Sequence, residues 1–105
     1  MTWAKIDDNF PQHPKAVLVG PLGRDLYVCG LCYSKRARTD GVIPPQMLKH
    51  LAPGLPTPVK IARQLVEAGL WETVDGGGYR IHDYHDWNDP AEVVQRRQAE
   101  KRERQ

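Results

Sequence analysis

The stretch from residue 57 to residue 83 constrains the fold most, because it joins one helix to two short strands. Thr57 is of a type favoured at a helix N-cap, and Pro58 is favoured at the first helical position. Gly69 is suited to end this helix, because glycine readily adopts the left-handed conformation. Two β-prone segments flank residues 75–78, Asp-Gly-Gly-Gly, which are typical of a hairpin turn. The expected elements are a helix over 57–68 and strands over 70–74 and 79–83.

The helix over 57–68 has a narrow polar face and a broad apolar one. At about 100° per residue, Lys60, Arg63, Gln64 and Glu67 share one side of the helix. The other side carries seven apolar or small side chains: Pro58, Val59, Ile61, Ala62, Leu65, Val66 and Ala68. We expect the apolar side to pack on a core and the polar side to face solvent or a ligand.

A longer helix is predicted upstream, over residues 23–38. Its first half has almost no polar face, so we expect this helix to be central and largely buried. Gly30 in its middle costs about 1 kcal/mol relative to alanine, which indicates a neighbour that packs closely there. At the C-terminal end, Lys35, Arg36 and Arg38 either complement the helix dipole or contact phosphate.

The remaining segments complete the order of elements. Residues 16–19 are expected to form one or two helical turns that Gly20 and Pro21 end. A strand at 42–43 and a short helix at 45–51 follow. The residues spaced to fold back on the core from the N-terminal segment are Trp3, Ile6 and Phe10. The resulting order predicts an α+β fold of the winged helix-turn-helix type, mostly α-helical with a small antiparallel β-hairpin as the wing.

A charged helical arm or tail is predicted over residues 89–105, after a winged-helix domain that spans residues 1–88. Asp89 followed by Pro90 is typical of a helix start. Few apolar residues follow, so this C-terminal charged helix is either a solvated helix or an arm that meets DNA or a protein partner.

The net charge of +2 over 105 residues argues against a protein that coats nucleic acid through charge alone. Nucleic-acid binding must then come from locally placed basic residues, or from pairing with a second copy as a homodimer. No segment approaches the ~18 apolar residues of a membrane span. The N-terminus lacks the apolar region of a signal peptide. We therefore expect a cytoplasmic protein without a membrane partner.

Cys29-x-x-Cys32 and His82-x-x-His85 have a spacing that could close a tetrahedral zinc site. The cysteines lie in so apolar a segment that we favour small buried side chains in the core, without a structural disulfide. We expect no metal and no cofactor. No phosphate-binding glycine loop is present, since residues 76–78 precede a strand rather than a helix. We therefore expect neither catalytic residues nor enzymatic activity.

Five short motifs occur in one order along the chain. They are W-x-K-I-D at 3–7, H-P-K at 13–15, T-D-G-x-I-P at 39–44, L-V-E-A-G-L-W-E at 65–72 and G-G-Y-R-I-H-D-Y at 77–84. Together, over about residues 2–88, they resemble the N-terminal winged-helix domains of phage and prophage replication proteins of the replisome-organiser type. This resemblance implies binding to origin DNA, in the initiation of phage or prophage DNA replication or in its regulation.

Sequence-specific binding of double-stranded DNA is the function we expect, with 57–68 as the recognition helix. Arginine and lysine can pair with guanine, and glutamine with adenine, in the major groove. Lys60, Arg63 and Gln64 meet this requirement, and Thr57 lies at the end of the helix where bases or phosphates are expected.

The wing over residues 75–80 is expected to contribute Arg80, either to a phosphate or to the minor groove. With Lys60, Arg63 and Arg80 as phosphate partners, the salt dependence of binding has a slope of only about −3. One copy then binds weakly unless a second copy, a partner or the tail assists. The auxiliary phosphate contacts expected in the tail are Arg96, Arg97, Lys101 and Arg102.

The alternative is a winged-helix module for protein interaction, which docks a replication or transcription protein without reading DNA. The modest net charge and Glu67 favour this alternative, whereas Lys60, Arg63, Gln64 and Arg80 favour DNA.

Overall fold

The longest element of the computed structural model, which describes residues 3–82 and 84, is helix α1 (Pro14–Ala37). Its start is capped by His13, whose Nδ1 accepts a hydrogen bond from the Lys15 backbone N–H at 3.1 Å. Gly20, at φ 74° and ψ −177°, interrupts the helix just before Pro21. The break expected at Gly20 and Pro21 is therefore confirmed.

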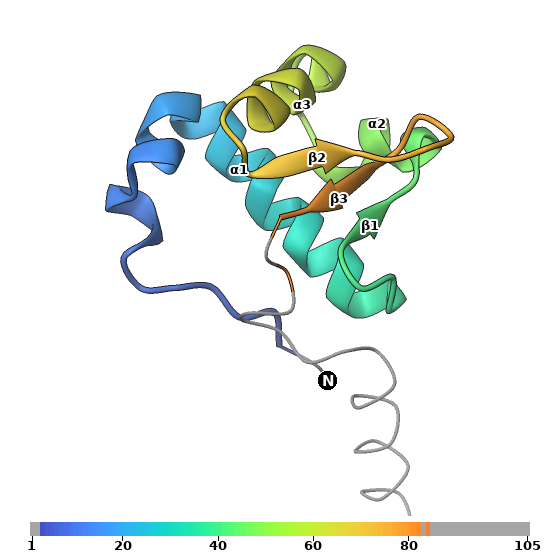
Figure 1. The fold of residues 1–105 in the computed structure, drawn as a ribbon, viewed down its shortest axis with the longest axis horizontal. Helices are drawn as coiled ribbons and strands as arrows, with labels where there is room; N and C mark the ends of the chain where they lie inside the picture. Colours follow the sequence, from blue (N-terminus) through green and yellow to red (C-terminus); the bar gives the residue numbers. More distant parts are fainter. Residues whose placement is uncertain (1–2, 83, 85–105) are drawn as a thin grey trace, which may run out of the picture.

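The other elements follow in the predicted order (Figure 1). They are the 3-10 helix η1 (Phe10–Gln12) before α1, and then β1 (Val42–Ile43), the 3-10 helix η2 (Pro45–Met47), α2 (Leu48–Leu51), α3 (Pro58–Glu67), β2 (Trp71–Thr73) and β3 (Tyr79–Ile81). Over the described residues the fold is thus α+β, with three α-helices and a small antiparallel sheet. Gly69 has φ 82°, as expected for the residue that ends α3.

The sheet has the strand order β1-β3-β2, so the first strand pairs with the last. Arg80 lies at the centre of this pairing, opposite Val42 on one side and Glu72 on the other. The turn between β2 and β3 contains Gly76 and Gly77 at positive φ. This three-stranded arrangement is compatible with a wing, although β2 and β3 are shorter than the segments 70–74 and 79–83.

The core lies between α1, α3 and one face of the sheet. Its buried apolar residues are Leu26, Leu31, Ile43, Leu48, Ala52, Ile61, Ala62, Leu65, Trp71, Ile81 and Tyr84. Gly30 on α1 faces this cluster, and a Cβ placed there would lie 2.8 Å from Trp71 Cζ2 and 3.0 Å from Ile43 Cδ1. The close neighbour expected at Gly30 is therefore confirmed.

Two expectations about burial are wrong. Helix α1 is not buried on all sides, since Leu22, Val28 and Cys32 are exposed. Its apolar first half packs on α3 and the sheet along one side only. In the N-terminal segment, Trp3 keeps 74% of its surface exposed and Ile6 is also exposed.

Phe10 is partly buried, and of the other residues in this segment Ala4 packs against the core. Phe10 stacks on Tyr27 of α1 with the ring centroids 4.9 Å apart. The N-terminal segment is therefore attached to α1 through η1 rather than inserted into the core.

Some predictions concern residues outside the described part. The charged helix over 89–105 lies there, as do residues 85–88 of the expected domain. Among the residues that the structure describes, no helix combines the length and the apolar character required to cross a membrane.

Candidate nucleic-acid interface

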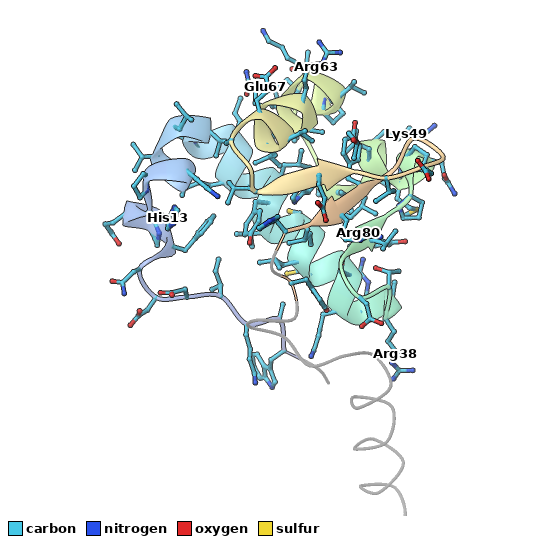
Figure 2. All side chains as sticks on the ribbon, viewed as in Figure 1. His13, Arg38, Lys49, Arg63, Glu67 and Arg80 are labelled. Carbon is cyan, nitrogen blue, oxygen red and sulfur yellow. The ribbon has the colours of Figure 1, made fainter. Side chains whose placement is uncertain are left out.

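The outer face of α3 carries the predicted recognition residues Lys60, Arg63 and Gln64, all of which are exposed. Their exposure follows from the amphipathic pattern, because Ile61 and Leu65 on the opposite side are buried in the core. Figure 2 shows the labelled Arg63 projecting from α3 away from the sheet. The structure thus brings two cations and one amide together on one rigid surface.

The first turn of α3 differs from the prediction in two ways. Thr57 is the N-cap residue, but its side chain makes no capping hydrogen bond and its φ is 43°. A β-branched residue at positive φ is uncommon, so Thr57 marks a sharp entry into the helix rather than a side-chain cap.

Val59 is the second difference, since 58% of its surface is exposed although it was assigned to the apolar side. Val59 and Arg63 are four residues apart in the sequence. At about 100° per residue, they lie only about 40° apart around the helix axis. The seven apolar residues span a wider part of the helix surface than the core covers, so the residues at the edge of that surface face solvent. The exposed surface of α3 therefore has an apolar component beside its basic one.

Arg80 lies on β3, outside the glycine turn of the wing. Its Nη1 is 3.7 Å from Glu72 Oε1 on the neighbouring strand, and the two side chains are 54% and 47% exposed. Glu72 and Arg80 share the solvent side of the sheet, because their neighbours Trp71 and Ile81 point into the core. The predicted wing cation is thus separated from the α3 surface and is already paired with a carboxylate.

Other elements also carry basic residues, of which Lys49 was not singled out by the sequence patterns. Lys49 on α2 is exposed and precedes α3, whose outer face carries Arg63; both are labelled in Figure 2. A lysine in a four-residue helix carries no periodic signal, which explains the omission. On α1, Lys35 is buried, whereas Arg36 and Arg38 are exposed at the end of the helix.

Only one of the two cysteines contacts the core. Cys29 is partly buried and packs against the core cluster, whereas Cys32 is exposed, so the assignment to the core is wrong for Cys32. Cys29 Sγ donates a weak hydrogen bond to Asp25 Oδ1 at 4.0 Å. Burial raises the pKa of the Cys29 thiol, and the charges of Asp25 and Cys32 add to this increase.

The metal-site residues lie only partly in the described region. Within residues 3–82 and 84, no group of three or more histidine, cysteine or acidic side chains could hold a metal ion. His85, the second histidine of the pair, lies outside that region, as do the proposed tail contacts Arg96, Arg97, Lys101 and Arg102.

Comparisons with protein-family models, with curated proteins and with solved structures found no match.

Proposed function

We propose that this domain is a winged-helix module that binds double-stranded DNA in a sequence-specific manner, with α3 in the major groove. The observation that supports this most directly is the outer face of α3, where Lys60, Arg63 and Gln64 are exposed on a helix whose other side is buried. The order of helices and strands supports the same proposal, because α3 is followed at once by the β2–β3 hairpin.

Each side chain on this face has a chemical role in the proposal. Lys60 and Arg63 donate to guanine or to phosphate, and Gln64 pairs with adenine. Val59 supplies an apolar contact of the kind that thymine methyl groups accept. Glu67 is the last residue of α3 and lies at the end of the helix away from the DNA.

The wing has a smaller role. Arg80 contacts a phosphate only when the phosphate competes with Glu72, since these side chains are paired in the free protein. Few cations are therefore available to one copy, and its affinity is low. A homodimer, a protein partner or the C-terminal arm supplies the additional contacts in this proposal.

The biological setting is proposed from the resemblance to replisome-organiser domains. The protein acts in the cytoplasm, in the initiation of phage or prophage DNA replication or in its regulation. The DNA sites recognised lie at a replication origin.

A selection from a library of random duplexes tests the readout. The wild-type protein is expected to enrich a short motif, whereas the double substitution Lys60→Gln and Arg63→Gln abolishes the enrichment. Replacing Lys5 and Lys15 by glutamine is the matched control, because it removes the same charge elsewhere on the exposed surface. A motif that survives the α3 substitutions contradicts the proposal.

A second candidate function is docking of a replication or transcription protein without DNA readout. The observation that favours it is the exposed apolar surface of Val17, Leu18 and Leu22 on the first half of α1, where Leu18 keeps 76% of its surface exposed. Under this function, neither the wild type nor the α3 variant enriches any sequence, and Leu18→Gln weakens the capture of the protein partner.

A further inference from the structure

A cavity of about 240 Å³ lies between the N-terminal segment, α1 and the ends of α3 and β3. None of the proposed DNA-binding residues lines it. Its walls are formed by Lys5, Ile6, Asp7, Asn9, Phe10, His13, Lys15, Tyr27, Leu31, Gly69, Leu70, His82 and Tyr84. This volume holds about eight water molecules at ~30 Å³ each and is smaller than a drug-sized pocket of roughly 300–1,000 Å³.

The polar part of the wall is rich in hydrogen-bond donors. Lys15 is held beside the end of α3, since a Cβ built on Gly69 would lie 3.2 Å from its Nζ. The carbonyl end of α3 favours a cation at this position. Among the described residues Lys15 forms no ion pair, so its ammonium group keeps donors for a ligand.

His13 adds a donor whose tautomer follows from the capping of α1. Its Nδ1 accepts the Lys15 backbone N–H, so a neutral imidazole carries its proton on Nε2. Asp7 is the acid in the wall, and its Oδ1 accepts the Asn9 backbone N–H at 2.7 Å. The wall thus contains two lysines and two histidines but one carboxylate, which already accepts a backbone N–H.

The rest of the wall is apolar and aromatic. Phe10 and Tyr27 are stacked on each other, and Leu31 and Leu70 line the same cavity. Small-molecule sites combine such a wall with a few convergent polar groups. The wall therefore suits a ligand with a flat apolar body and one anionic group.

We propose that this cavity binds a small aromatic carboxylate, whose anionic group is held by Lys15 and His13 and whose ring lies against the apolar wall. The inference does not depend on DNA binding. The ligand contacts Leu70 in this proposal. The carbonyl of Leu70 accepts the His82 backbone N–H at 3.0 Å, so the bound ligand lies where the end of α3 meets the end of β3.

Titration of the full chain with benzoate, followed by ¹⁵N–¹H correlation spectra, tests the proposal. Saturable shifts are expected at the amides of Gly69, Leu70 and His82. Benzamide, the neutral counterpart, is expected to bind at least about tenfold more weakly, the equivalent of one charge-assisted hydrogen bond. Inorganic phosphate, which lacks the ring, is expected to bind at least about tenfold more weakly because it buries no apolar surface against the wall.

Two substitutions and one control assign the contacts. Lys15→Met weakens benzoate binding by about tenfold or more, for the same reason. Lys49→Met removes the same charge from the exposed surface of α2, away from the cavity wall, and leaves benzoate binding unchanged. His13→Asn keeps a residue favoured at an N-cap while removing the imidazole. This variant is therefore expected to preserve the fold and to weaken benzoate binding.

Three results would overturn the proposal. One is the absence of saturable shifts in a wild-type spectrum that reports a folded protein. Another is equal weakening of benzoate binding by Lys15→Met and Lys49→Met. The third is phosphate binding as tight as that of benzoate, because the apolar wall would then contribute nothing.

Discussion

The ion pair between Arg80 and Glu72 predicts that DNA binding becomes tighter when the carboxylate of Glu72 is removed. Glu72→Gln removes the carboxylate that lies 3.7 Å from Arg80 Nη1, while it keeps the size of the side chain and one accepting oxygen. Arg80 then meets a DNA phosphate without first leaving an ionic partner. The carboxylate also no longer repels the phosphate.

The exposure of the two side chains limits both the stability of the ion pair and the gain in DNA affinity on its removal to modest values. About half of each side chain is exposed, so the pair contributes only about 0.2–1 kcal/mol to stability. Releasing Arg80 gains a free energy of similar size, which corresponds to roughly two- to fivefold tighter DNA binding. Because Arg80 already counts among the three phosphate partners, Glu72→Gln adds no contact and the slope of log K against log salt stays at about −3.

Fluorescence anisotropy with a labelled duplex measures the affinity, and urea unfolding measures the stability. Asp8→Asn is the matched control, because it removes one exposed acid from the N-terminal segment and changes the net charge equally. Equal gains in DNA affinity for Glu72→Gln and Asp8→Asn would show that the effect comes from net charge alone. If Glu72→Gln and Arg80→Gln both leave the affinity unchanged, Arg80 does not lie at the DNA and the reasoning is refuted.

Three further predictions concern packing, base readout and pH. Gly30→Ala places a Cβ 2.8 Å from Trp71 Cζ2, and we expect urea unfolding to show a loss of about 1–3 kcal/mol from overpacking. Val59→Ser, which leaves no methyl group on the side chain, should abolish the preference of the protein for thymine over deoxyuridine at one position of its site, measured by competition between the two duplexes, because deoxyuridine lacks the methyl group. The folded state raises the pKa values of Cys29 and Tyr84, mainly through burial, so it holds these protons more firmly than the unfolded chain. Their contribution to stability is therefore complete below about pH 9 and is lost as the pH rises further, which urea midpoints should report, with a smaller loss in Cys29→Ala.

The elements with a clear period or a clear stop could be predicted from the sequence. The apolar spacing of 58–68 and the glycine at 69 define α3, and the structure has both features. Gly30 could be interpreted because glycine within a helix is unfavourable unless a neighbour needs the space. These signals are local, so they do not depend on the rest of the fold.

The features that were missed depend on contacts between distant segments. Periodicity identifies the apolar side of a helix but not how much of it a neighbour covers, which explains the errors at Val59 and Cys32. The pairing of Arg80 with Glu72 requires the register of β2 against β3. The cavity forms where an N-terminal segment without periodicity packs on α1, so no sequence pattern reveals it.

The central claim is that the outer face of α3 holds DNA, and the salt dependence of binding tests it most directly. With Lys60, Arg63 and Arg80 as the phosphate partners, the wild-type slope of log K against log salt is about −3, from about −0.9 for each contact. Replacing Lys60 and Arg63 by glutamine should reduce the slope to about −1, whereas replacing Lys5 and Lys15 by glutamine should leave it near −3. Equal slopes for the two double variants would contradict the assignment of α3 as the DNA-binding surface.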